Sequence, residues 1–163
     1  MHRVKIYQGD IKSLAVDAIV SAESSPAESL CAARAVGAEF LDSCLEIGKC
    51  PVGEVVVSVA ENLAADLVIH TSAPIWRGGD YKEDQQLASC YHNAMQAAKT
   101  ENRKSIAFPT ISCGSAGFPA RRAVSIAVRE VNYALRQNPL LESVVFCCFD
   151  RVTTALYRNY IGK

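Results

Sequence analysis

The stretch "ISCGSAGFP" (residues 111–119) places glycines and small side chains between an apolar run and a segment of helix formers. Small residues let the backbone approach a ligand closely. A helix that begins there presents unpaired N–H groups and the positive end of its dipole, which suit an anion such as a phosphate. Because glycine and proline also punctuate ordinary turns, a plain connector is the alternative interpretation.

One thiol lies inside this stretch, at Cys113. A thiol at a helix N-terminus can have a lowered pKa, which would make it a nucleophile or a redox sensor. We favour the plainer interpretation, in which the side chain faces the core and only the N–H contributes. The other six cysteines are scattered without a CxxC pair. We therefore expect reduced thiols and neither a disulfide framework nor a metal site.

Further chemistry-bearing side chains follow other apolar runs: Asp10 in "QGDI", the serines of "SAESSPAES", and Phe149 in "CFDR". A carboxylate, an aromatic ring and a glycine loop could together hold the amine, the base and the phosphates of a nucleotide. Asp10 could instead cap the following turn, and Phe149 could belong to the core. His70 lies within an apolar run, so we interpret it as a core histidine.

Two kinds of segment alternate along the chain and would position these residues. Short β-branched runs predict strands at 4–8, 17–22, 54–60, 67–73, 105–110 and 143–149. Segments of helical period lie at roughly 28–46, 82–99, 119–137 and 151–160. In the second of these, Leu87, Tyr91, Ala94 and Ala98 recur at steps of three and four, which predicts one buried face.

This alternation predicts an α/β fold, a three-layer α/β/α sandwich around a mixed, mostly parallel sheet of six or seven strands. Several strands are apolar throughout, as expected when both faces of a sheet are covered. Ligands of such sheets bind beyond the carboxyl ends of the strands, where the segments named above would meet. The pair Arg121 and Arg122 opens a predicted helix, and we expect a solvated face there, although a nearby anion would suit it.

Composition bounds the remaining possibilities. The 163 residues, 50% of them hydrophobic, suit a single domain over 1–163. With 17 basic and 17 acidic residues the net charge is zero, which argues against nucleic acid or a membrane surface as partner while leaving room for a local basic patch. No apolar run is long enough to span a bilayer or to form a signal peptide, so we expect a soluble, cytoplasmic protein.

Four blocks carry a family resemblance: "VKIYQGDIKSLAVDAIV", "CPVGEVVVSVA", "VIHTSAPIWRGGDYKEDQQL" and "SIAFPTISCGSAGFP". In this order and spacing they resemble macrodomains, especially the branch of bacterial O-acetyl-ADP-ribose deacetylases, from about residue 4 to 157. The resemblance implies that Asp10 holds the adenine amino group, with Ile11 beside it, and that Phe149 borders the adenine. It implies a diphosphate cradle formed by Ser112, Cys113, Gly114, Ser115, Ala116 and Gly117. It implies no cofactor.

Several positions depart from the family pattern. Hydrolases of the family carry an "NAAN" block, then a glycine run and a catalytic aspartate, whereas this chain has Ser21 and Ser24 at the two asparagines and lacks about five residues of the glycine run. In the segment that follows Ser24, where the family has its catalytic aspartate, Glu28 offers the carboxylate. In the phosphate loop, Ser115 and Ala116 replace a bulky residue and an aromatic residue. The catalytic candidates are therefore Ser24 and Glu28, with Ser21 among the ligand-binding residues.

These departures fall on the distal ribose, while the adenine contacts are retained. We therefore predict a degenerate macrodomain that binds ADP-ribose, a related adenine nucleotide or an ADP-ribosylated protein, with weak or no hydrolase activity. The first alternative is an O-acetyl-ADP-ribose deacetylase or ADP-ribosyl hydrolase with altered catalytic groups. The second is recognition of poly-adenosine or RNA, which the zero net charge disfavours.

Overall fold

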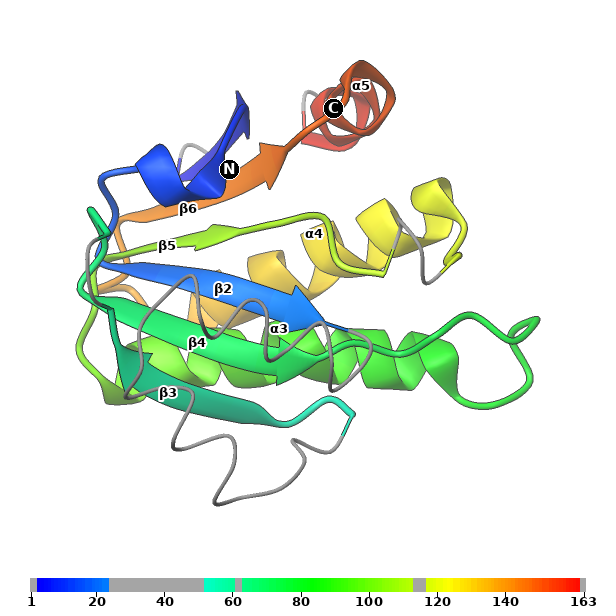
Figure 1. Cartoon of the computed structure of the whole chain (residues 1–163), viewed down its shortest axis with the longest axis horizontal. Coiled ribbons are helices and arrows are strands. Elements are labelled where there is room, and N and C mark those ends of the chain that lie inside the picture. The colour runs from blue at the N-terminus through cyan, green and yellow to red at the C-terminus, as the bar shows by residue number, and fades with distance from the viewer. Residues whose placement is uncertain (1–2, 24–51, 61–62, 113–116, 162–163) are drawn as a thin grey trace.

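The computed structural model describes residues 3–23, 52–60, 63–112 and 117–161 (Figure 1). Its strands are β1 (Val4–Gln8), β2 (Ala18–Glu23), β3 (Val55–Val59), β4 (Leu67–Ser72), β5 (Ser105–Phe108) and β6 (Ser143–Cys148). Its helices are the 3₁₀ turn η1 (Ile11–Ser13), α3 (Glu83–Thr100), α4 (Ala120–Gln137) and α5 (Arg151–Ile161). Each strand and each α-helix among the described residues lies within about two residues of its predicted range, and η1 was not predicted as an element.

The six strands form one sheet in the order β1-β6-β5-β2-β4-β3. All neighbouring pairs are parallel except β3 with β4. The carboxyl ends of the five parallel strands therefore lie along one edge of the sheet, and the arrows of β2, β4 and β6 point toward it in Figure 1. The segments that follow β1, β2, β4, β5 and β6 all begin at this carboxyl edge.

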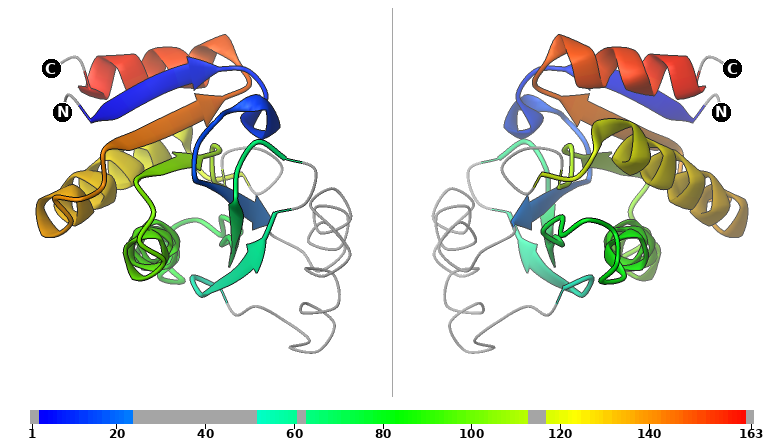
Figure 2. Two further views of the ribbon diagram at one scale, coloured as in Figure 1. Left: turned by 90° about the vertical axis from the view of Figure 1, so that its left-hand side faces the viewer. Right: turned by 90° about the vertical axis from the view of Figure 1, so that its right-hand side faces the viewer.

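Helices α3, α4 and α5 cover one face of the sheet (Figure 2), and the main hydrophobic core lies beneath them. Four buried rings cross this core from α3 to α5: Tyr91 contacts Phe108 at 5.0 Å, Phe108 contacts Phe146 at 6.2 Å, and Phe146 stacks on Tyr157 at 4.4 Å between centroids. The predicted buried face of α3 is confirmed, because its four residues are at most 1% exposed. Burial of these rings fixes α3 and α5 against β5 and β6.

A smaller cluster covers part of the opposite face, where Ile19, Val68, Ala107 and Val145 of the sheet contact residues around η1 such as Leu14. The helix predicted at about 28–46 lies outside the described residues. The predicted α/β fold class with a six-strand, mixed and mostly parallel sheet is confirmed. None of the described helices is long and apolar enough to cross a membrane.

Candidate functional site

Two predicted ligand residues are neighbours at the carboxyl edge of β1 and β6. The register pairs Gln8 with Cys148, and one step further the Gly9 N–H donates to the Cys148 carbonyl at 3.0 Å. Asp10 and Phe149 directly follow Gly9 and Cys148 in the chain, just beyond the ends of the two strands. The strand pairing thus brings together a carboxylate and an aromatic ring that lie 139 positions apart in sequence.

Asp10 begins η1 with an exposed side chain. Its Oδ1 accepts from the Lys12 N–H at 3.0 Å, so the capping interpretation of this residue is confirmed. Capping occupies one carboxylate oxygen, and Oδ2 has no hydrogen bond to the described residues. Ile11 follows half-buried and packs against the smaller hydrophobic cluster, which fixes the turn to the sheet. The same carboxylate can therefore cap the turn and accept from a ligand.

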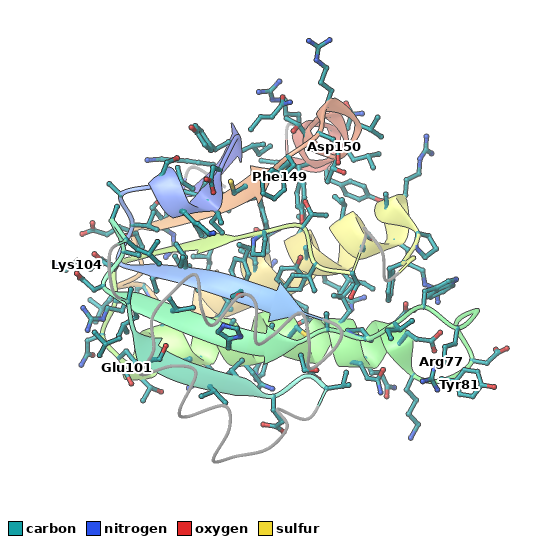
Figure 3. The ribbon with its side chains drawn as sticks, in the orientation of Figure 1. Arg77, Tyr81, Glu101, Lys104, Phe149 and Asp150 are labelled. Carbon is teal, nitrogen blue, oxygen red and sulfur yellow. The ribbon has the colours of Figure 1, made fainter. Side chains whose placement is uncertain are left out.

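Phe149 is 73% exposed, which excludes the core interpretation. The next residue, Asp150, caps α5 because its Oδ1 accepts from the Thr153 N–H at 2.7 Å (Figure 3). The cap fixes the point at which the chain leaves β6 and enters the helix. An exposed ring at a fixed strand end offers a flat apolar surface to a base.

Two cysteines lie directly beneath this corner. Cys147 donates from Sγ to the Gly9 carbonyl at 3.2 Å, and burial, with Cys148 and Asp10 nearby, raises its pKa to about 11. Burial also raises the pKa of Cys148. Both are free thiols, and they are protonated at neutral pH. They support the corner as packing groups and hydrogen-bond donors rather than as nucleophiles.

The described residues at the two ends of the predicted phosphate loop are fixed by hydrogen bonds. Ser112 is buried in a left-handed conformation (φ 66°), and its hydroxyl donates to the Pro74 carbonyl at 2.8 Å. Its own carbonyl accepts from the Phe118 N–H at 2.8 Å, which closes the loop before α4. Gly117 also has a positive φ, of 78°, a conformation that glycine adopts without strain. Cys113, Gly114, Ser115 and Ala116 lie outside the described residues.

The segment after β4, residues 73–82, is organised by a buried carboxylate. Glu83 is 1% exposed and accepts from the backbone N–H groups of Arg77, Gly79 and Tyr81 at 2.6–2.9 Å. Burial alone would raise its pKa, but these donors and its own N–H lower it to about 2. The carboxylate remains charged and folds the segment around itself. We call residues 73–82 with Glu83 the bracing segment.

Trp76 connects the bracing segment to the start of α4. Its ring lies 4.8 Å from the ring of Phe118, and the Arg122 guanidinium lies 5.2 Å from its centroid. Arg122 also makes a bidentate ion pair with Asp84, with its Nε donating at 2.7 Å. Arg122 is exposed, which agrees with the predicted solvated face, and Asp84 of α3 is a nearby anion of the kind that would suit it. Arg121 is exposed, as predicted.

The centre of the carboxyl edge is formed by β2 and β4. Ser21 is half-buried on the same side of the sheet as Ile19 and pairs with His70 in the ladder. His70 is 4% exposed, and desolvation lowers its pKa to about 4. It is neutral at pH 7, which agrees with the prediction of a core histidine. Ser24 and Glu28 lie outside the described residues.

Two features of this edge were missed by reasoning from sequence. The first is the bracing segment. Its signal in the sequence was the stretch "GGDYKE", in which a glycine turn leads to an acidic residue, Glu83, at the start of a helix. The second is a pair of arginines on α5, at a spacing of seven residues. Among the described residues no group of three or more histidine, cysteine or carboxylate side chains could hold a metal ion.

Comparison with known proteins places the chain in one family. Residues 29–127 match the Macro domain. The O-acetyl-ADP-ribose deacetylase of Escherichia fergusonii is 40% identical over 99% of this chain and 96% of its own length, and that of Klebsiella pneumoniae is 42% identical over 98% and 96%.

Solved structures agree with the sequence relatives. The Trypanosoma brucei macrodomain in complex with ADP-ribose has a TM-score of 0.85 at 26% identity, covering 98% of this chain and 69% of its own. The Oceanobacillus iheyensis macrodomain with ADP has a TM-score of 0.82 at 27% identity, covering 96% and 88%. The resemblance stated from four sequence blocks is thereby confirmed at the level of the family, and the chain belongs to the Macro domain family.

Proposed function

We propose that this macrodomain, as a single domain over residues 1–163, binds ADP-ribose or a related adenine nucleotide at its carboxyl edge, with weak or no hydrolase activity. The observation that carries the proposal is the hydrogen bond from the Gly9 N–H to the Cys148 carbonyl, since it sets Asp10 beside Phe149. Family membership and the ligands of the two structural relatives support the same ligand class.

In this proposal the base is recognised by Asp10 and Phe149. The exocyclic amine of adenine donates to Asp10 Oδ2 while Oδ1 keeps its bond to the Lys12 N–H. The exposed ring of Phe149 covers the base. Ile11 supplies apolar contact from the turn. A charged acceptor and an aromatic surface are the two groups that distinguish adenine from a plain sugar phosphate.

The phosphates would lie at the loop between β5 and α4. Its left-handed residues Ser112 and Gly117 turn the backbone, and α4 begins directly after it with Pro119 as the N-terminal cap. Backbone N–H groups of such a turn and the positive end of the helix favour a diphosphate. We include Cys113, Gly114, Ser115 and Ala116 in this cradle on the family resemblance alone.

Weak or absent catalysis follows from the residues proposed at the distal ribose. Serine at positions 21 and 24 is shorter than the asparagine of the hydrolase pattern and cannot orient two separate atoms as an amide does. Reacting groups must be held to about half an ångström, so loss of that orientation costs far more in rate than in binding. In this proposal the protein binds ADP-ribose without hydrolysing it efficiently, and an ADP-ribosylated protein is a candidate partner.

A hydrolase is the second candidate, because the bacterial relatives that are about 40% identical over almost the full chain are O-acetyl-ADP-ribose deacetylases. In that case Glu28, or a water held near Ser24, would replace the family's catalytic groups. The two candidates share the binding site and differ only in turnover.

Turnover of O-acetyl-ADP-ribose and of an ADP-ribosylated protein separates them. We expect rates at least ~10²-fold below those of the active relatives, with no recovery in Ser24→Asn and calorimetric binding of ADP-ribose intact. Robust wild-type turnover that disappears in Glu28→Ala would instead establish the hydrolase and make Glu28 its catalytic residue.

A further inference from the structure

A groove of about 460 Å³ lies between the end of edge strand β1 and helix α5, and two of its residues, Gln8 and Arg151, are each two positions in sequence from a residue of the proposed adenine site. Its lining consists of Gln8, Arg151, Thr154, Ala155, Arg158 and Asn159. Figure 3 shows Phe149 and Asp150 where β6 passes into α5, so the groove begins two residues after the proposed adenine ring. In strand order it lies beyond β6, on the side away from β5 and the phosphate loop.

The groove is basic although the whole chain has no net charge. Arg151 and Arg158 are both exposed, and neither forms an ion pair with any described residue. They lie two helical turns apart, about 10 Å along the axis. The lining residues include no carboxylate, and Gln8 and Asn159 add neutral donors. An uncompensated pair of guanidinium groups with amide donors is suited to phosphate oxygens.

The carboxylates near this groove are already committed to other bonds. Asp150 accepts from both the N–H and the hydroxyl of Thr153, at 2.7 and 3.2 Å. Asp10 caps η1. Inside the groove, the Thr154 hydroxyl donates to the Asp150 carbonyl at 2.7 Å, so this hydroxyl already has an acceptor within the protein. The two arginines are thus left as the charged groups facing the groove.

We propose that this groove binds a phosphate carried on the 2′- or 3′-hydroxyl of the adenosine that occupies the adenine site. The inference rests on the proposed function. A 5′-linked diphosphate would run toward the loop after β5, whereas the groove lies on the β1 side of β6, so a phosphate of the same nucleotide that reached it would be attached to another hydroxyl of the ribose. Arg151, nearest Phe149, contacts this phosphate, and Arg158 contacts the group that continues from it.

The probes are AMP, adenosine 2′,5′-bisphosphate and adenosine 3′,5′-bisphosphate, titrated calorimetrically into the full chain. A charge-assisted bond at an exposed site predicts that a bisphosphate binds about 10-fold tighter than AMP. The bisphosphate that binds more tightly than AMP identifies which ribose hydroxyl, 2′ or 3′, carries the bound phosphate. Arg151→Gln should abolish the gain without changing the affinity for AMP, and added salt should reduce the gain.

Arg129→Gln is the matched control, because Arg129 is an exposed arginine on α4 and the change removes the same charge far from the groove. It should keep the full gain. If AMP binds but neither bisphosphate binds tighter, or if Arg129→Gln loses as much as Arg151→Gln, the groove is not a phosphate site while the proposed function stands. If neither AMP nor ADP-ribose binds, the proposed function is overturned and this inference with it.

Discussion

The two halves of the carboxyl edge differ in how their residues are held. On the β4 side, Glu83 accepts three backbone hydrogen bonds and Trp76 packs on Phe118, so the bracing segment is fixed by internal contacts. On the β1 side, Asp10 and Phe149 are exposed beyond a single pair of strands. We infer that the first half contributes mainly to stability and the second mainly to recognition.

The difference also shows where change is tolerated. A substitution in the bracing segment removes contacts made to Ser112 and Phe118, the described residues on either side of the phosphate loop. A substitution at Asp10 or Phe149 removes a surface group and leaves the core intact. Variants that separate effects on stability from effects on binding therefore test the comparison.

The largest expected effect is at Phe118, which is 2% exposed and contacts Trp76. Phe118→Ala should lower the free energy of unfolding by about 3–5 kcal/mol, because it leaves a cavity where the buried ring packs against Trp76. Chemical denaturation measures this, with Tyr133→Ala on the exposed part of α4 as control. Wild-type stability in Phe118→Ala would show that the β4 side does not depend on this packing.

Residues on the β4 side should also be the ones through which low pH destabilises the fold. His70 has a folded pKa of about 4 against 6.5 unfolded, so the unfolded chain binds the proton first as pH falls. The contribution of neutral His70 to the free energy of unfolding is therefore fully present above pH 6.5. It is lost as the pH falls toward 4, by about 3 kcal/mol at most. Below that, Glu83 loses its contribution between pH 4.5 and about 2, because its folded pKa is depressed.

Unfolding measured from pH 7 to pH 4 checks the histidine. His70→Gln should flatten the decline, whereas His92→Gln, at an exposed position on α3, should leave it unchanged. An equally steep decline in His70→Gln would assign the acid sensitivity to other groups.

On the β1 side, Phe149→Ala should weaken adenine nucleotide binding by about 1–3 kcal/mol, the value of stacking a base on an aromatic ring. Its stability should change by less than about 0.5 kcal/mol, since the ring is exposed. Calorimetry and denaturation on the same sample give both numbers. Val152→Ala, also an exposed position, is the control for binding. A loss of stability without a loss of binding would reverse the comparison.

The smallest expected effect is at Lys82, the residue before α3, which has a left-handed backbone (φ 63°) and no side-chain capping bond. Lys82→Gly should stabilise the chain by about 0.5 kcal/mol, because glycine relieves the strain at the cost of some unfolded-state entropy. Lys82→Ala keeps the strain and should give no gain in denaturation. An equal gain in both variants would assign the effect to the lost charge.

Strands and helices were predictable because buried parallel strands are continuous apolar runs and α3 shows a clear helical period. The partners of single residues were not. The first turn of α4 contains no acidic residue that could pair with Arg122. Its partner is Asp84 of α3, 38 positions away in sequence. Periodicity shows which face of a helix is polar, but only packing shows which charges there have no ion-pair partner among the described residues, as with Arg151 and Arg158.

The candidate site was predictable as a set of strand ends and not as a geometry. Asp10 and Phe149 could be named from the family resemblance, but their adjacency depends on the pairing of β1 with β6. The capping and recognition interpretations of Asp10 seemed to exclude each other in sequence. They are compatible in three dimensions because the cap occupies Oδ1 alone and leaves Oδ2 without a hydrogen bond to the described residues.

Calorimetric titration of ADP-ribose into the wild type, Asp10→Ala and Asp10→Asn tests the central claim most directly. Asparagine caps a turn as well as aspartate does, but its amide cannot accept from adenine at the position of Oδ2. The account predicts wild-type binding, a loss of about 1.5–3 kcal/mol in both variants, and wild-type stability in Asp10→Asn. Undiminished binding in Asp10→Asn, or no binding of ADP-ribose by the wild type at millimolar concentration, would contradict it.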